Sequence, residues 1–161
     1  KNYCWSNKMD RVELHVIATV SNNRDHLEDD NWGAVVSQIT LSEELSSDLF
    51  IGLDAFSHVE ILFLFHRQNL EQKVSPTRHP RSNPDWPKIG LLAQRSSYHP
   101  NPVGFTSAKI LGVKGRVLTV QGLDAVNGTP ILDIKPVFRE FTPAEIEQPQ
   151  WVSELMKNYW S

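Results

Sequence analysis

Asp133 and Lys135 stand two residues apart in a segment where polar and apolar side chains alternate. Because successive side chains of a strand point to opposite faces, this spacing places both of them on the face of Ile131, opposite Leu132 and Ile134. A carboxylate and an ammonium on one face can form an ordinary surface ion pair, which contributes little to stability. In a cleft, the same pair can orient a substrate or tune a proton acceptor. The spacing alone leaves both interpretations open.

A second polar cluster lies in residues 94–104 and combines a cation, Arg95, with hydroxyls and the amide of Asn101. Pro100 and Pro102 stiffen its backbone, and rigid placement lowers the entropic cost of holding a polar ligand. The alternative is a proline-stiffened turn whose polar groups satisfy its own backbone.

Two further polar clusters lie where predicted strands end. Residues 53–58 precede an apolar strand that ends at His66 and Arg67, and residues 122–136 contain a tight-turn dipeptide at 127–128. The chain has no GxGxxG, Walker, GxSxG or HExxH sequence, so a doubly wound nucleotide-binding fold has no support. The histidines lack the spacing of a metal-binding pair, and we expect no metal site.

The net charge of −3 results from 16 basic and 19 acidic side chains and argues against a generally basic, nucleic-acid-coating protein. The distribution is nevertheless polarised. Residues 1–72 carry 5 basic and 12 acidic side chains, residues 73–99 carry 5 and 1, and residues 100–161 carry 6 of each. Residues 73–102 hold six of the ten prolines, which predicts a rigid basic loop that either binds a ligand or lies solvated at the surface. Its basic side chains are Lys73, Arg78, Arg81, Lys88 and Arg95.

Short runs of β-branched and aromatic residues, bounded by turn residues, predict several strands and few helices. A short helical turn is expected over residues 42–49, with Ser42 as its cap. This pattern indicates a mainly β fold, a small closed or nearly closed β-barrel with a few short helices and a C-terminal helix. We expect one domain over residues 1–161, with its core in 12–140 and a helical tail in 141–161. The expected strands are 14–20, 34–41, 57–65, 89–94, 105–111, 116–121 and 130–134.

The tail opens with a helix-start signal, in which Thr142 is followed by Pro143 and, three residues on, by Glu145. Apolar and aromatic side chains then recur at helical spacing, which is typical of core or dimer packing rather than of an aromatic binding site. These side chains are Trp151, Val152, Leu155, Met156 and Tyr159.

The longest uninterrupted apolar run, residues 61–65, is far shorter than the roughly 20 residues that span a bilayer, and we expect no membrane association. No basic segment followed by an apolar one opens the chain, and residues 1–8 lack strand or helix patterning. The single Cys4 cannot form an internal disulfide. We therefore expect a reducing compartment, the cytoplasm.

Three ordered blocks resemble the TsaA-like family, also called YaeB- or TrmO-type. The segment LDAFSH (residues 53–58), followed by an apolar strand and His66, resembles its "GLEEFSH…FH" block. Arg95-Ser96 with the PNPVG segment (residues 100–104) resembles "ATRSPxRPNPIG". The segment GLDAVNGTPILDIKP (residues 122–136) is almost identical to "LDxxDGTPVLDIKPY". The chain departs from these blocks at some positions, such as His99 in place of an arginine, and so resembles a divergent short branch of that family.

The resemblance implies a β-barrel that binds S-adenosylmethionine and methylates the N6 atom of a threonylcarbamoyl-adenosine next to a tRNA anticodon. It also implies a homodimer with the cofactor near its interface. Two alternatives stay open: a non-catalytic barrel that binds S-adenosylmethionine or RNA as a sensor or adaptor, and a methyltransferase of a small molecule. In the second alternative, the basic loop would hold an anionic group of the substrate.

The resemblance also assigns site residues. Asp133, Lys135 and His99 are the candidates for catalysis, with Asp133 stabilising charge on the substrate nitrogen and helping to remove its proton. Arg95 can supply a cation to the cofactor carboxylate. The cofactor-binding candidates are Asn31, Trp32, Gly33, His66, Arg67, Arg95, Asn101, Leu123, Asp124, Ala125, Gly128 and Thr129.

Overall fold

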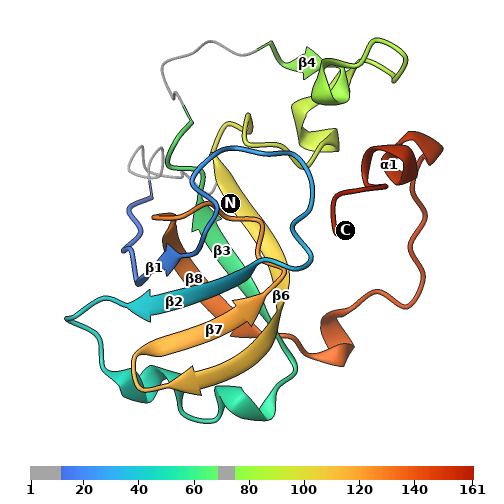
Figure 1. Ribbon diagram of the computed structural model, residues 1–161. Helices are drawn as coiled ribbons and strands as arrows, with labels where there is room; N and C mark the ends of the chain where they lie inside the picture. The colour runs from blue at the N-terminus through green and yellow to red at the C-terminus, as the bar shows by residue number, and fades with distance from the viewer. Residues whose placement is uncertain (1–11, 69–74) are drawn as a thin grey trace, which may run out of the picture.

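The computed structural model describes residues 12–68 and 75–161, so Cys4, residues 1–8 and Lys73 lie outside the described residues. Six antiparallel strands close into a barrel in the order β1-β2-β7-β6-β3-β8 (Figure 1). The mainly β fold with a closed barrel, predicted from the sequence, is therefore confirmed. The strands are β1 (Ala18–Ser21), β2 (Val36–Leu41), β3 (His58–Leu64), β6 (Val103–Lys114), β7 (Val117–Gln121) and β8 (Pro130–Pro136).

The barrel is filled by the apolar side chains that alternate along its strands. In β3, Val59, Ile61 and Phe63 point inward and are at most 1% exposed. Burial of each such side chain contributes about 1.5–3 kcal/mol. Gly104, the partner of Phe63 on β6, has no room for a side chain, because a Cβ there would lie 2.3 Å from the Phe63 ring. The interior is packed at this level, so a ligand site has to be built from the loops.

An irregularity in β8 decides where Asp133 points. The register with β3 shifts between Leu62 and Phe63, because Leu62 pairs with Asp133 whereas Phe63 pairs with Ile131. Ile131 is fully buried, and Ile134 also packs against the core. The bulge therefore turns Asp133 away from the face of Ile131, and the expectation that these two residues share a face is wrong. Strict alternation holds only where no extra residue interrupts the ladder.

Residues 75–102 leave the barrel between β3 and β6 and form a separate excursion (Figure 1). The strand expected over 89–94 is wrong, since only residues 89–90 are in a strand and they pair with nothing but β4 within the described residues. The segment has no barrel neighbour, and the Gln94 side chain instead donates to the carbonyl oxygens of Arg78 (3.0 Å) and Ile89 (3.3 Å). The excursion contains β4 (Thr77–Arg78), η3 (Pro80–Ser82), β5 (Ile89–Gly90) and η4 (Leu91–Ala93).

After β8 the chain forms the 3-10 turn η5 (Arg139–Phe141) and, farther on, the helix α1 (Gln150–Leu155). Figure 1 shows this part running away from the barrel and returning, so that the C-terminus lies next to it. The helix start expected at Thr142 is wrong, because residues 142–149 are not helical. This stretch is exposed and buries no apolar face that could stabilise a helix. The helix begins only after Pro149.

The remaining helical elements, η1 (Ser47–Phe50) and η2 (Leu53–Ala55), are single turns. The expected turn over 42–49 begins later than predicted, because Ser46 rather than Ser42 caps it by accepting from the amide of Asp48 (3.2 Å). Ser42 instead donates to the carbonyl of Val16 (3.1 Å). Across residues 12–68 and 75–161, no helix combines the length and apolarity needed to cross a membrane.

Candidate functional site

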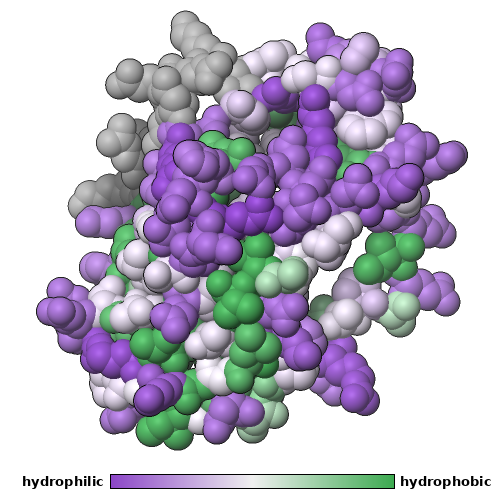
Figure 2. Space-filling view, viewed as in Figure 1, coloured by the Kyte–Doolittle hydropathy of each residue, from purple (hydrophilic) through white to green (hydrophobic). Residues whose placement is uncertain are grey.

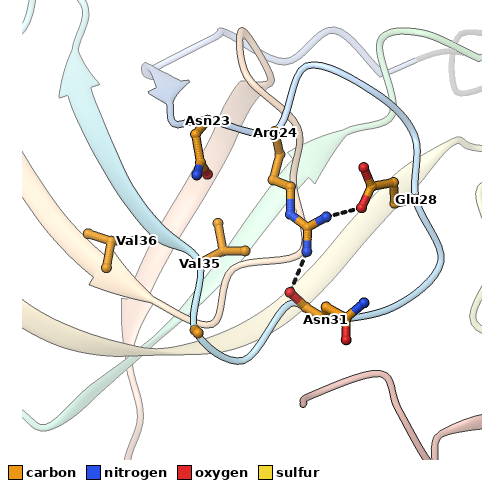
Figure 3. Close-up of a pocket in the computed structure, with 7 residues that line it drawn as sticks. Asn23, Arg24, Glu28, Asn31, Val35 and Val36 are labelled. Carbon is orange, nitrogen blue, oxygen red and sulfur yellow. Dashed lines mark hydrogen bonds and ion pairs between the residues drawn. The ribbon is translucent and has the colours of Figure 1, made fainter.

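The loop between β1 and β2 borders a pocket of about 560 Å³ (Figure 3). Asn22 fixes the start of this loop. Its side-chain nitrogen donates to Ser37 Oγ (2.8 Å) and to the carbonyl of Ala125 (2.9 Å), and its side-chain oxygen accepts from the amide of Arg24 (3.0 Å). Since Ser37 lies on β2 and Ala125 follows β7, the loop is tied to two neighbouring strands. The pocket is lined by Asn23, Arg24, Glu28, Asn31, Ala34, Val35 and Val36.

Arg24 organises the loop from within. Its guanidinium forms an ion pair with Glu28 and donates to the carbonyl oxygens of Asp30 (3.2 Å) and Asn31 (Figure 3). The same group lies over the ring of Trp32, 4.9 Å from its centroid. Asn31 adopts a left-handed φ of 65°, which asparagine tolerates better than most residues. The pocket therefore presents both a cation and a carboxylate.

Asp124, which follows β7, accepts hydrogen bonds on both carboxylate oxygens. The hydroxyl of Thr106 donates to one oxygen and the hydroxyl of Tyr159 donates to the other. Burial, together with the charge of Asp124, raises the pKa of Tyr159 above its usual range, although Arg95 and Arg81 act in the opposite direction. The tyrosine therefore stays protonated and donates to Asp124.

The C-terminal segment brings residues 31–33 and Asp124 together. The amide of Asn31 donates to the carbonyl of Asn158 (3.0 Å), and the amide of Trp32 donates to that of Tyr159 (2.8 Å). Gly33 lies so close to this segment that a Cβ there would be 2.0 Å from the carbonyl oxygen of Trp160. The ring of Tyr159 also packs against a small apolar cluster that consists of Trp32, Val35 and Val126.

His66 and Arg67 approach the turn that precedes β8. Arg67 donates to the carbonyl oxygens of Asp25 and Asn127, the latter at 3.3 Å. Gly128 has a φ of 81°, which favours glycine, and its Cβ position would lie 3.9 Å from Nε2 of His66. Desolvation, followed by the charge of Arg67, lowers the pKa of His66. The imidazole is therefore held neutral at neutral pH.

Three predicted cofactor-binding side chains belong to the core or to the turn itself. Leu123 and Ala125 are at most 2% exposed, and Thr129 is equally buried. The Thr129 hydroxyl donates to the carbonyl of Val126 (2.7 Å), which closes the turn. These residues can meet a ligand only through their backbone atoms.

The predicted polar residues of the 94–104 cluster largely satisfy the chain itself. Arg95 donates to the carbonyl of Phe105, and His99 Nε2 donates to that of Gln94 (2.7 Å). Asn101 accepts on its backbone from the amide of Val103 (2.8 Å) and is exposed. Ser96 differs from them, because its hydroxyl is buried and has no hydrogen-bond partner among residues 12–68 and 75–161.

Asp133 and Lys135 form an ion pair of 2.6 Å on the outer surface of β8, with side chains 43% and 69% exposed. The Asp133 carboxylate also accepts from the amide of Ile134 (2.9 Å). The geometry is that of a surface pair, the first of the two interpretations that the spacing left open. Their catalytic role stays a prediction.

The proline-rich excursion contacts both the β1–β2 loop and the tail. Arg81 forms an ion pair with Asp30 (2.7 Å) and donates to the carbonyl of Asp29 (3.1 Å). The indole nitrogen of Trp86 donates to the carboxylate of Glu154 on α1 (3.1 Å). The rings of Trp86 and Trp151, which also belongs to α1, lie 6.5 Å apart between their centroids. Part of the acidic charge near the N-terminus thus neutralises part of the basic excursion.

The polar side chains of this site that were not predicted as site residues include Asn22, Asn23, Arg24, Glu28, Thr106 and Tyr159. Arg24 had a usable signal, since it is a cation three residues after the end of β1. Thr106 had another, because it is a polar residue at an inward position of β6. Tyr159 was assigned to packing, and its hydroxyl contact joins segments too far apart for spacing to reveal.

Within the two described stretches of the chain, no group of three or more His, Cys, Asp or Glu residues could hold a metal ion.

A closed antiparallel barrel whose loops border a polar pocket defines the class of small β-barrel proteins. The family model described as the tRNA-methyltransferase O N-terminal domain matches residues 29–142, and the chain belongs to this family. The tail from residue 143 onward and the first part of the β1–β2 loop lie outside the matched range.

Similar proteins include two named tRNA (adenine(37)-N6)-methyltransferase. The one from Homo sapiens is 41% identical over 112 residues, covering 68% of this chain and 23% of that protein. The one from Escherichia coli K12 is 39% identical over 94 residues, covering 56% and 40%. A probable S-adenosyl-L-methionine-binding protein from Pyrococcus abyssi is 32% identical over 103 residues, covering 63% and 53%. The chain thus spans between about a quarter and about half of these relatives.

A solved structure supports the fold. The crystal structure of TrmO from Pseudomonas aeruginosa superimposes with a TM-score of 0.66 at 23% identity, covering 85% of this chain and 61% of that one.

Proposed function

We propose that the protein is an S-adenosylmethionine-dependent methyltransferase that methylates N6 of a modified, threonylcarbamoyl adenosine in tRNA. The observation that carries the proposal is the meeting of three predicted ligand-binding elements within a domain of this family. These elements are residues 31–33, Asp124 and the proline-rich excursion. The C-terminal segment connects residues 31–33 to Asp124, and Arg81 connects the excursion to Asp30 in the same loop. The names of the human and Escherichia coli relatives give methylation of an adenine at N6 in tRNA, which supports the proposal.

The pocket between β1 and β2 fits the chemistry of this cofactor. S-adenosylmethionine carries a carboxylate, an ammonium, a sulfonium and a nucleoside, and the pocket is lined by the Arg24–Glu28 ion pair and by the amide side chains of Asn23 and Asn31. When bound, the cofactor supplies a methyl group to an in-line displacement.

The roles of the chain's own residues follow from their placement. His66, neutral at neutral pH, lies next to the Gly128 turn, where its imidazole can accept a hydrogen bond from the ligand, and Arg95 attracts the cofactor carboxylate. On the substrate side, Asp133, which is ion-paired with Lys135, accepts the proton of the exocyclic amine. His99 is held by the carbonyl of Gln94 and orients the excursion toward the substrate.

The surface next to the site suits a polynucleotide. Figure 2 shows a mostly hydrophilic face over the β1–β2 loop and the excursion, with apolar residues gathered over the barrel below. The excursion contributes Arg78 and Lys88, which can dock phosphates by local rather than net charge. We further propose a cytoplasmic homodimer of single-domain chains, in which two such surfaces serve one tRNA.

A methylation assay tests the proposal. The protein is incubated with labelled S-adenosylmethionine and either bulk tRNA or a metabolite extract, and modified nucleosides are identified by mass. Incorporation into an N6-methylated threonylcarbamoyl adenosine is expected. Incorporation into a metabolite instead would identify a small-molecule methyltransferase.

A non-catalytic S-adenosylmethionine-binding barrel is the second candidate, because the C-terminal segment covers Asp124 and residues 31–33. Tight cofactor binding without methylation of any acceptor would favour it over the enzyme.

A further inference from the structure

The last residues of the chain hold polar groups that the family resemblance assigns to the ligand. The amides of Asn31 and Trp32 donate to the carbonyl oxygens of Asn158 and Tyr159, at 3.0 and 2.8 Å. The Tyr159 hydroxyl donates to Asp124. Each backbone N–H is a single donor, so a ligand cannot bond these amides while the segment is docked.

The chemistry of this contact matches the one that a nucleoside would make. Tyr159 places an aromatic ring against Trp32, Val35 and Val126 and directs a hydroxyl to the carboxylate of Asp124. A nucleoside likewise presents a planar ring with acceptor atoms and ribose hydroxyls that donate to acidic side chains. The segment therefore occupies donors, an acceptor and an apolar surface of the kinds that a nucleoside would use.

The docked segment is held closely but by few interactions. At Gly33, the backbone of Trp160 approaches so closely that no side chain could be accommodated without moving it. The side chains of Asn158 and Trp160 are exposed, and residues 157–161 lie beyond the last residue of α1. A segment whose side chains are largely exposed opens at a small cost in free energy.

We propose that residues 157–161 form a displaceable strap that competes with the nucleoside part of the ligand for Asn31, Trp32 and Asp124. This inference rests on the proposed function, because it takes S-adenosylmethionine as the ligand. When the strap is closed in most molecules, the apparent Kd equals the intrinsic Kd divided by the fraction of molecules in which the site is free. Ligand binding in turn releases the strap, since the linkage is reciprocal.

Trypsin cleavage after Lys157 reports the state of the strap in the full chain. Lys157 is exposed, and release of the peptide 158–161 can be followed by mass spectrometry. Saturating S-adenosylmethionine is expected to accelerate this cleavage several-fold. In calorimetry, Tyr159→Phe, which removes only the hydroxyl that binds Asp124, is expected to bind S-adenosylmethionine about 5- to 20-fold more tightly than the unmodified chain.

Two glycine variants calibrate the cleavage. Gly33→Ala introduces a Cβ against the Trp160 backbone and should release the peptide faster without ligand. Gly112→Ala, where a Cβ meets open space, is the matched control and should behave like the unmodified chain.

The outcomes separate the two proposals. Slower cleavage with S-adenosylmethionine, together with weaker binding by Tyr159→Phe, would show that the segment helps to bind the ligand, and would overturn the proposal that it competes with the ligand. Cleavage and affinity that are insensitive to ligand and variant would overturn it as well, while the cofactor assignment would stand. Absence of binding at millimolar S-adenosylmethionine in every variant would overturn the proposed function itself and the strap with it.

Discussion

The hydroxyl of Tyr159 donates a hydrogen bond to the carboxylate of Asp124, 35 residues earlier in the chain. Asp124 follows β7 at the end of the barrel and also accepts from Thr106 on β6. The contact therefore joins the C-terminal segment, which lies outside the family-matched range, to two strands that lie within it. It is the point at which the tail and the candidate ligand site become one structure.

Replacement of this carboxylate should lower the stability of the fold. Asp124→Asn keeps one acceptor oxygen but presents an NH2 group to the second hydroxyl, which then loses its acceptor. We expect the free energy of unfolding to fall by about 1–3 kcal/mol, measured by urea denaturation. Asp133→Asn, a carboxylate at the surface, is the control and should change it by less than about 0.5 kcal/mol. If the free energy of unfolding falls equally in both variants, the hydrogen bonds from Thr106 and Tyr159 to Asp124 do not stabilise the fold more than a surface ion pair does.

Removal of Arg95 should weaken cofactor binding. Its guanidinium lies near the Asp124–Tyr159 pair, as its effect on the pKa of Tyr159 shows, and can form a charge-assisted bond to a carboxylate. Arg95→Ala is expected to reduce the affinity for S-adenosylmethionine about tenfold in calorimetry. Arg139→Ala, on the exposed turn η5, is the control and should leave the affinity unchanged. A similar loss in both variants would point to general charge rather than to this site.

Asp133 should affect turnover more than binding. Asp133→Asn removes the proposed proton acceptor and keeps the shape of the side chain, so kcat is expected to fall about 100-fold. The affinity for S-adenosylmethionine should stay within about twofold, because Asp133 lies on the substrate side. Glu60→Gln, a carboxylate on the neighbouring strand β3 opposite Lys135, serves as control in the same assay. If Asp133→Asn retains the full rate, Asp133 is only a partner of the surface ion pair.

The stability of the protein should depend on His66 in mildly acidic solution. Desolvation, followed by the charge of Arg67, lowers the pKa of His66 below 6.5 in the folded chain. The unfolded chain therefore binds the proton more readily, and the contribution is fully present above pH 6.5 and lost as the pH falls toward the lower folded value. Urea midpoints between pH 5 and 8 should show this slope in the unmodified chain and a smaller one in His66→Gln. An unchanged slope in that variant would assign it to other groups.

Most of the barrel could be predicted from the sequence because its signals are local. Alternating residues such as Val59, Ile61 and Phe63 indicate an inward face whatever the rest of the chain does. The family blocks similarly located the turn at Gly128, where a positive φ favours glycine. The predicted strand over residues 89–94 is wrong because the segment has no barrel strand to pair with. The predicted helix start at residue 142 is wrong because residues 142–149 have no apolar face that could be buried against the protein.

The sequence by itself determined the fold class, the family and the polar segments that bear on function, because each depends on short-range pattern. Only the tertiary structure decided which of those segments meet. The bulge that turns Asp133 away from Ile131 depends on the register between β8 and β3. The docking of Tyr159 on Asp124 and Trp32 depends on the path of a tail that no local periodicity describes. Contacts between residues far apart in the chain come from the closure of the barrel and from packing around it, and residue spacing alone carries no record of them.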